Sequence, residues 1–301
     1  MIRIGSRGSQ LALWQSNHIA TLLRAQGHEV AIATITTTGD RLQAVPFARV
    51  GSKGMFTKEI EEALADGAID LAVHSLKDLP TEVDARFVIA AVTERVDPRD
   101  VFVSTRFRSM DDLPAGARVG TSSLRRQSQL RARWPGVEYV EFRGNVDTRL
   151  RKLSEGQVDA AVLAAAGLDR LERTEWVRER FSADVLCPAP GQGALAIECR
   201  AADERTREVL ASLDHAESRF AVTAERVALA ALGGGCQVPI GAYCRREGDA
   251  YRISGCVSSP DGATVLRAEM RGSDAPSLGA DLADALLRQG ALQLLAEQGD
   301  K

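Results

Sequence analysis

The apolar and polar positions of the first ninety residues switch repeatedly between the period of a strand and the period of a helix. Residues 2–5 and 30–37 are short runs rich in apolar or β-branched side chains, which favours strands. Between them, apolar side chains at helical spacing predict one buried helix face before a stop at Gly27: Leu11, Trp14, His18 or Ile19, and Leu22.

A second helix and a buried strand follow. Phe56, Ile60 and Leu64 mark the apolar face of a helix that Gly67 would end, and residues 69–75 form a nearly continuous apolar run. Such a run is typical of a strand that is covered on both faces. The strand–helix–strand order therefore predicts a mixed, mostly parallel sheet with helices on both sides.

The pattern restarts after the polar segment 93–100, and it changes again near residue 218. The first stretch predicts strands and helices much like those before it, with strands at 118–120, 137–142 and 159–163. The second predicts a helix, two strands and a last helix, at 220–232, 251–258, 263–271 and 278–298. We expect an α/β protein with two lobes and a cleft between them, followed by a small α+β domain.

Composition narrows the class of protein. The chain has 301 residues and a formal net charge of −3, which argues against a nucleic-acid binder. No apolar run has secretory or membrane-spanning length, so we expect a cytoplasmic protein. Its five cysteines, at 187, 199, 236, 244 and 256, form no CxxC pair and have no histidine at ligand spacing. Reduced thiols and no metal are expected.

Cations collect where the predicted strands end. Lysine occurs only at 53, 58, 77, 152 and 301, so 33 of the 38 basic residues are arginines. In open parallel sheets, ligands bind in the loops that follow the strands. The polar loops at those places all carry a cation: 6–9, 75–78, 121–126 and 143–145.

The loop at 121–126 suits an anion. Thr121, Ser122 and Ser123 would open a helix whose free N–H groups and hydroxyls are donors. Arg125 and Arg126 add planar guanidiniums that can grip carboxylates. Arg143 and Arg149 flank the next strand-to-helix junction. For the loop at 121–126 alone, a capped helix with solvated arginines is an equally good interpretation, and for Arg143 or Arg149 alone a surface ion pair is the better one. Together the four arginines indicate an anion site.

Two further side chains could carry chemistry. Asp78 follows a buried strand beside Lys77 and could stabilise positive charge on a substrate, although it could also cap the turn before Pro80. Cys236 follows three glycines, whose backbone freedom would let the thiol reach a neighbouring cleft, although a buried cysteine is the alternative. The GxGxxA run at 191–196 does not follow a strand, so we reject a dinucleotide site.

Eight segments in chain order resemble the porphobilinogen deaminase family, also called hydroxymethylbilane synthases, and together they span most of the chain. They are IGSRGSQLALWQ, VGSKGMFTKEIE, DLAVHSLKDLP, ERVDPRDVFVS, VGTSSLRRQSQL, FRGNVDTRL, APGQGALAIECR and GGGCQVPIG. The resemblance implies two lobes similar to type II periplasmic binding proteins and a third domain. Lobe one would comprise 1–95 and 190–212, lobe two 96–189, and the C-terminal α+β domain 216–301.

The resemblance also implies a reaction. Four porphobilinogen molecules would be joined head to tail into hydroxymethylbilane, with loss of ammonia each time. The primer would be a dipyrromethane cofactor bound to Cys236 through a thioether. The implied enzyme is a cytoplasmic monomer that acts on a small molecule and binds neither nucleic acid nor membrane.

Site roles carry over residue by residue. Asp78 matches the catalytic aspartate. The implied cofactor-binding residues, besides Cys236, are Ser75, Lys77, Thr121, Ser123, Arg125 and Arg126. The implied substrate-binding residues are Arg7, Ser9, Lys53, Phe56, Ser122, Arg143, Arg149, Arg170 and Gln192. Lys53, Phe56 and Lys58 match a mobile loop. The chain departs from the family pattern at Asp147, where a small or neutral residue is common, and at Arg49, where lysine occurs.

Two other functions are weighed. A non-enzymatic anion-binding protein of the periplasmic type would share the two lobes, but it would not need the cysteine loop. A transcription-factor regulatory domain would need a helix-turn-helix and a basic patch, and the sequence has neither.

Overall fold

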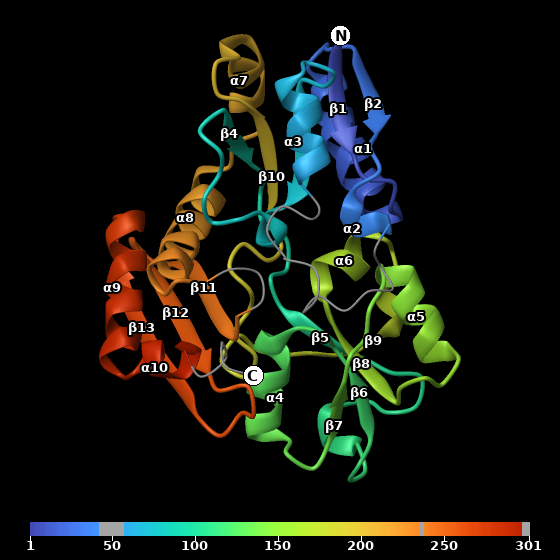
Figure 1. The fold of residues 1–301 in the computed structure, drawn as a ribbon, viewed down its shortest axis with the longest axis vertical. Helices are drawn as coiled ribbons and strands as arrows, with labels where there is room; N and C mark the ends of the chain where they lie inside the picture. The colour runs from blue at the N-terminus through green and yellow to red at the C-terminus, as the bar shows by residue number, and fades with distance from the viewer. Residues whose placement is uncertain (42–56, 235–237, 297–301) are drawn as a thin grey trace. The chain divides into compact units, whose positions relative to one another are not determined.

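The computed structural model describes residues 1–41, 57–234 and 238–296. The chain divides into two compact units (Figure 1). The N-terminal unit comprises residues 1–96 and 194–219, and the C-terminal unit comprises residues 97–193 and 220–301. Each unit is described by itself below.

The N-terminal unit contains a mixed five-stranded sheet in the order β2-β1-β3-β10-β4. Its strands are β1 (Ile2–Ser6), β2 (Val30–Thr34), β3 (Leu71–Ser75), β4 (Phe87–Val92) and β10 (Leu195–Arg200). β1 pairs in parallel with β2 and β3, whereas β10 runs antiparallel to both β3 and β4. The central place of β10 means that a segment from late in the chain completes this sheet.

Helices cover both faces of that sheet. They are α1 (Gln10–Ala25), α2 (Thr38–Arg41), α3 (Lys58–Ala65) and α7 (Glu204–Ala211). Leu71 and Val73 of β3 pack in one cluster with side chains of α1 and α7, and Ala72 packs in another with side chains of α3. Because successive side chains of a strand point to opposite faces, α1 and α7 cover one face and α3 the other.

The buried face of α1 differs from the predicted one. Its buried residues are Gln15, Ser16, Ile19, Ala20 and Leu23. Trp14 is 36% exposed and stacks on His18 with ring centroids 5.2 Å apart, so the prediction that it belongs to the buried face was wrong. The buried face of α1 instead includes the polar residue Gln15, whose side-chain amide donates a hydrogen bond to Ser75.

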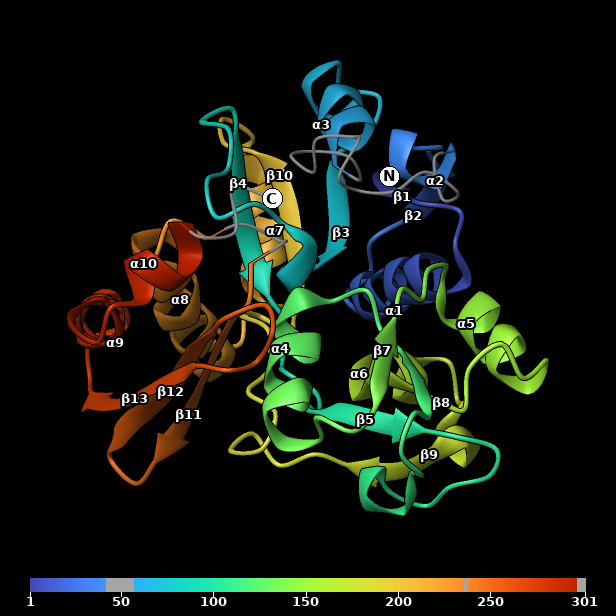
Figure 2. The same ribbon diagram turned by 60° about the horizontal axis from the view of Figure 1, so that its bottom comes forward.

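The C-terminal unit begins with a second sheet of the same pattern, in the order β7-β6-β8-β5-β9 (Figure 2). Its strands are β5 (Asp100–Val103), β6 (Arg118–Gly120), β7 (Glu138–Val140), β8 (Ala160–Ala164) and β9 (Val177–Arg180). β6 is parallel to β7 and β8, and β5 is antiparallel to β8 and β9. Its helices are α4 (Leu124–Arg133), α5 (Val146–Ser154) and α6 (Ala165–Arg170).

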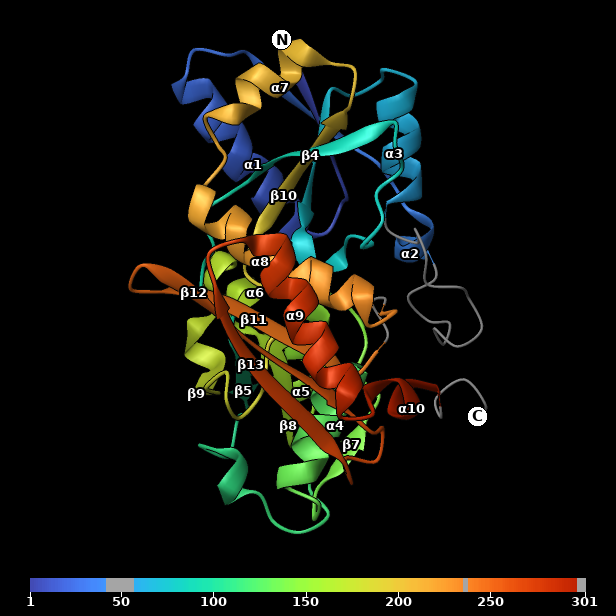
Figure 3. The same ribbon diagram turned by 90° about the vertical axis from the view of Figure 1, so that its left-hand side faces the viewer.

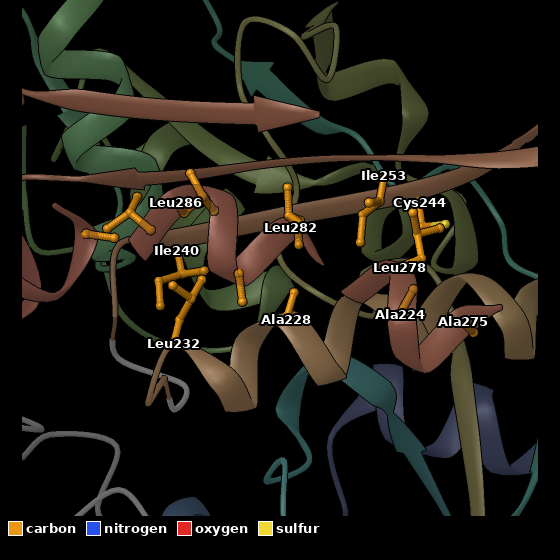
Figure 4. Close-up of a cluster of buried hydrophobic side chains, with 14 of the residues drawn as sticks. Ala224, Ala228, Leu232, Ile240, Cys244, Ile253, Ala275, Leu278, Leu282 and Leu286 are labelled. Carbon is orange, nitrogen blue, oxygen red and sulfur yellow. The ribbon is translucent and has the colours of Figure 1, made fainter. Parts of the chain in front are cut away.

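A three-stranded antiparallel sheet completes the C-terminal unit. Its strands are β11 (Ile240–Glu247), β12 (Ala250–Ser258) and β13 (Val265–Gly272). Helix α8 (Ala216–Ala231) precedes this sheet in the chain, and α9 (Ala275–Arg288) and α10 (Ala291–Ala296) follow it. Figure 3 shows α9 lying along the sheet, and Figure 4 shows its leucines packed with Ala224 and Ala228 of α8 and with Ile253 of β12.

The fold class expected from the sequence is confirmed: two α/β sheets and a small α+β part. The single last helix predicted over 278–298 was wrong, because Gly290 adopts a positive φ of 97° that separates α9 from α10. The domain boundaries inferred from the resemblance stay predictions. Within residues 1–41, 57–234 and 238–296, no helix is long and apolar enough to cross a lipid bilayer.

Candidate functional site

In the N-terminal unit, the predicted site residues follow the ends of two neighbouring parallel strands. Arg7 and Ser9 come after β1, and Ser75 ends β3, which pairs with β1. Ser9 caps α1 by accepting a hydrogen bond from the N–H of Ala12 at 3.3 Å. Gln15 Nε2 donates to Ser75 Oγ at 2.8 Å, so Ser75 is held against the first turns of α1.

The turn after β3 presents Lys77 and Asp78. Leu76–Asp78 forms a short 3₁₀ helix, and the N–H of Leu79 donates to the carbonyl of Leu76 at 3.1 Å. Leu76 and Leu79 are buried, whereas Asp78 is exposed. The two apolar side chains therefore fix the turn from inside, and the carboxylate of Asp78 stays accessible to a ligand.

His74 is a packed strand residue of β3. Its Nε2 lies 3.0 Å from Glu198 Oε2 of β10, and both side chains are buried. This pair joins β3 to β10 directly before the turn that carries Asp78.

In the C-terminal unit, three hydroxyl residues follow the end of β6. Ser123 is the N-cap of α4, and its Oγ accepts from the N–H of Arg126 at 3.4 Å. Ser122 Oγ accepts from the N–H of Phe142 at 2.9 Å, which ties the loop after β6 to the loop after β7. Thr121 is buried and its Oγ1 accepts from the N–H of Ser123 at 3.3 Å.

Arg125 and Arg126 share one buried carboxylate, that of Asp100 at the start of β5. Asp100 is 0% exposed, and the two arginines are 4% and 6% exposed. Arg125 Nη1 lies 2.7 Å from Asp100 Oδ2, and Arg126 donates to Oδ1 through Nε at 3.0 Å and Nη2 at 2.8 Å. Burial alone would raise the pKa of Asp100, but the two guanidiniums outweigh it and hold that pKa far below its usual range.

Sequence reasoning missed Asp100. It lies in the segment ERVDPRDVFVS, which contributed to the family resemblance without a role being assigned to its acidic residues. A signal was present: an aspartate directly before the apolar run of a strand is a buried charge, and buried charges need partners.

Gln192 and Arg170 are also buried. Gln192 is 0% exposed, and its Nε2 donates to Asp100 Oδ1 at 2.9 Å and to the carbonyl of Pro98 at 2.7 Å. Arg170 Nη2 donates to the carbonyl of Gly193 at 2.8 Å. Burial lowers the pKa of the Arg170 guanidinium to about 10.

Arg143 and Arg149 flank the start of α5, as predicted. Asn145 caps that helix by accepting from the N–H of Thr148 at 2.8 Å. Arg143 Nε lies 2.5 Å from Glu141 Oε1, and Arg149 is half-buried. The hydrogen bond from Phe142 to Ser122 brings this junction beside the start of α4.

Three predicted site residues, Lys53, Phe56 and Cys236, lie outside the described residues. The other four cysteines are free and buried.

Comparison of this chain with models of known protein families identifies its family. A family model for the porphobilinogen deaminase dipyromethane cofactor binding domain matches residues 2–208. A second, for the porphobilinogen deaminase C-terminal domain, matches residues 219–288.

The solved structures to which this chain is similar include two binding proteins. A periplasmic substrate-binding protein of an ABC transporter from Coxiella burnetii is 14% identical, with a TM-score of 0.44 over 75% of this chain and 97% of its own. A nutrient binding protein from Burkholderia cenocepacia bound to methionine is 16% identical, with a TM-score of 0.45 over 72% and 93%. Because the two family models together cover nearly the whole chain, this protein belongs to the porphobilinogen deaminase family.

Proposed function

We propose that this chain is the transferase of porphyrin biosynthesis that joins four porphobilinogen molecules head to tail into hydroxymethylbilane and releases ammonia. The family models for the cofactor-binding and C-terminal domains support this function. The observation that carries it is the pair Arg125 and Arg126 on a single carboxylate at the start of α4. Two adjacent guanidiniums at the start of a helix are donors that suit the carboxylates of an anionic ligand.

The residues present fit a dipyrromethane cofactor. Each of its pyrrole rings carries an acetate and a propionate, so the ligand needs cations and hydrogen-bond donors rather than a metal. The start of α4 offers both, in Arg125, Arg126 and the hydroxyls of Thr121 and Ser123. When bound, the cofactor supplies the pyrrole carbon at which the product grows. On the family resemblance alone, Ser75 and Lys77 of the N-terminal unit are also proposed to bind the cofactor.

Asp78 is proposed as the catalytic residue. Its carboxylate is exposed on a turn that two buried leucines fix. It can accept hydrogen bonds from pyrrole N–H groups and stabilise positive charge on the substrate as the bond to the leaving ammonia breaks. A fixed carboxylate does this without rearrangement when the charge appears, which is why the rigid turn matters.

The substrate's acetate and propionate groups need cations beyond those that hold the cofactor. We assign this role to Arg7 and Ser9 after β1, and to Arg143 and Arg149 beside α5, with Ser122 as a further donor. Lys53 and Phe56 belong to the same proposal on the resemblance alone.

Cys236 is proposed as the attachment point of the cofactor. The residues on either side of its segment are firmly packed: Leu232 and Ile240 are buried in one hydrophobic cluster. Gly233 has a φ of 68° shortly after the last residue of α8, so the helix has ended before the segment that contains Cys236. A thioether at this position would tether the cofactor to the C-terminal part of the chain. The proposal includes a monomeric enzyme in the cytoplasm, as the family resemblance implies.

Incubation of the purified protein with porphobilinogen tests the function. We expect release of ammonia and a product that cyclises spontaneously to uroporphyrin I. Intact-mass spectrometry should show a covalent dipyrromethane that is absent from Cys236→Ser. Binding of porphobilinogen without release of ammonia would instead identify a non-enzymatic anion-binding protein.

A further inference from the structure

The backbone and the side chain of Asp100 are both held in place. It begins β5, where its backbone pairs with Ala164 of β8 and its carbonyl accepts from the N–H of Phe181 at 3.0 Å. Its side chain is 0% exposed. A carboxylate held on a central strand cannot move toward a ligand, so whatever it does must act through its neighbours.

Those neighbours are the two arginines, and Asp100 constrains them differently. All three guanidinium nitrogens of Arg126 have protein partners, because Nη1 also donates to the carbonyl of Val162 at 3.1 Å. Arg125 is held through Nη1 alone, which lies 2.7 Å from Asp100 Oδ2 and donates to the carbonyl of Cys187 at 2.6 Å. In the part of the chain that the structure describes, Nε and Nη2 of Arg125 make no hydrogen bond. Arg125 is therefore oriented at one end, with donors remaining at the other.

A second set of buried residues holds Asp100 in place. Gln192 Nε2 donates to Asp100 Oδ1, and Gln192 lies in the turn at 190–193. That turn is pinned by Glu225 of α8, which is 0% exposed. Glu225 Oε2 accepts from the N–H of Gly191 at 2.7 Å, and its Oε1 accepts from the N–H of Cys244 on β11 at 2.7 Å. The carboxylate that orients the arginines is thus connected to the three-stranded sheet.

We propose that Asp100 is a positioning residue for the cofactor site, and that Gln192 acts through Asp100 rather than by touching the substrate. Asp100 fixes the guanidiniums of Arg125 and Arg126 in the orientation that receives a carboxylate of dipyrromethane. Preorganised donors bind without a further loss of side-chain freedom, which is the benefit of such an arrangement. This inference rests on the proposed function, because it takes Arg125 and Arg126 as cofactor-binding residues.

Asp97 provides a matched control. It also accepts from two arginines, with Arg99 Nη2 at 2.8 Å and Arg180 Nη1 at 2.8 Å from its Oδ2. It lies in the same segment, and neither of its arginines belongs to the proposed site. Asp97→Asn therefore removes a carboxylate shared by two arginines without disturbing the start of α4.

The test measures how fast apo-protein acquires its cofactor. Asp100→Asn, Gln192→Met, Asp97→Asn and Arg125→Gln are made in cells that cannot produce porphobilinogen. Each is then incubated with porphobilinogen, and the fraction carrying covalent dipyrromethane is followed by intact mass. Thermal unfolding is recorded for each variant. The Nε–H resonances of Arg125 and Arg126 are compared by NMR, which reports orientation independently of activity.

We expect Asp97→Asn to load at the wild-type rate whatever its thermal stability. Gln192→Met leaves every charge in place and should load roughly tenfold more slowly, with a shifted Arg126 Nε–H resonance. Asp100→Asn and Arg125→Gln should load more slowly still. Should Asp100→Asn fail to fold, Gln192→Met decides alone.

Two results would overturn the inference in distinguishable ways. Wild-type loading by folded Asp100→Asn or by Gln192→Met, with slow loading by Arg125→Gln, would make Asp100 a purely structural ion pair and leave the proposed function intact. Wild-type loading by Arg125→Gln would remove Arg125 from the cofactor site, and with it the premise of this inference.

Discussion

Cys187 occupies the space that a side chain at Gly241 would need: a Cβ atom at Gly241 would lie 2.9 Å from the Cβ, the carbonyl oxygen and the Sγ of Cys187. Gly241 is on β11, opposite Cys256 of β12. The same carbonyl of Cys187 accepts the hydrogen bond from Arg125. A small residue on β11 thus lets the backbone before Pro188 reach both the three-stranded sheet and the arginine pair.

Gly241→Ala should destabilise the protein, since a backbone carbonyl, unlike a flexible side chain, has little room to give way. We expect a loss of about 1–3 kcal/mol in the free energy of unfolding, measured by urea denaturation. Gly136→Ala is the control, because a Cβ there meets no atom within 4 Å. Equal stability of the two variants would contradict the close approach.

Gly279→Ala separates helix propensity from packing. In an exposed helix, alanine is favoured over glycine by about 1 kcal/mol. In α9, however, a Cβ at Gly279 would lie 2.2 Å from the carbonyl oxygen of Ala224 on α8. We expect a lower midpoint of thermal unfolding, whereas a raised midpoint would show that the two helices can separate at no cost.

Asp78→Asn should strongly reduce the rate of turnover, with little effect on stability. The side chain is exposed, so its replacement removes no packing. Loss of a group that stabilises charge in the transition state typically costs about 10²–10³-fold in rate. Ammonia release measures the rate and thermal unfolding measures the stability. A variant that keeps more than half of the wild-type rate would exclude Asp78 as the catalytic residue.

Labelling of free thiols should show whether Cys236 carries the cofactor through a thioether. Cys187, Cys199, Cys244 and Cys256 are at most 2% exposed, and burial raises the pKa of the Cys199 thiol to about 11. Because iodoacetamide must reach a sulfur atom to alkylate it, these buried groups should resist the reagent at pH 8 in the folded protein. We expect one label, at Cys236, in the apo-protein and none in the holo-protein, counted by mass. A holo-protein labelled at Cys236 would rule out the thioether.

Acid should remove the stabilisation of the folded protein that Asp97 provides through its two arginines. Burial acts to raise the pKa of this carboxyl, but Arg99 and Arg180 outweigh it and lower the pKa below the usual value. In the unfolded chain the pKa is about 3.9. A depressed folded pKa stabilises the protein above the unfolded pKa, and the effect is lost as pH falls through the folded pKa. The difference in urea midpoint between wild type and Asp97→Asn should therefore shrink from pH 7 to pH 3; a difference that grows would have the wrong sign.

The local sequence pattern was enough to predict an element where the element's own residues determine which of its faces is buried. α3 is an example: Ile60 and Leu64 were predicted as its apolar face, and both are buried. Asp78 and Lys77 could likewise be placed after a buried strand because Leu71–Ser75 is apolar throughout its first three positions. In these cases periodicity and the turn that follows carry the information.

Long-range partners could not be read from periodicity. Leu195–Arg200 is an ordinary apolar run, and its partners β3 and β4 lie about a hundred residues earlier in the chain. The pairing of Arg125 and Arg126 with Asp100 is of the same kind. Guanidiniums at the start of a helix look the same in a sequence whether they contact water, a ligand or a carboxylate from another strand.

The position of β10 between β3 and β4 has a consequence for synthesis on the ribosome. The first 92 residues contain the segments of β1 to β4, but β10, which pairs with both β3 and β4, is not complete until residue 200. At about 5–20 residues per second, the incomplete sheet must wait roughly 5 to 20 seconds with two strand edges unpaired. The nascent chain is thus exposed to edge-to-edge association during that interval.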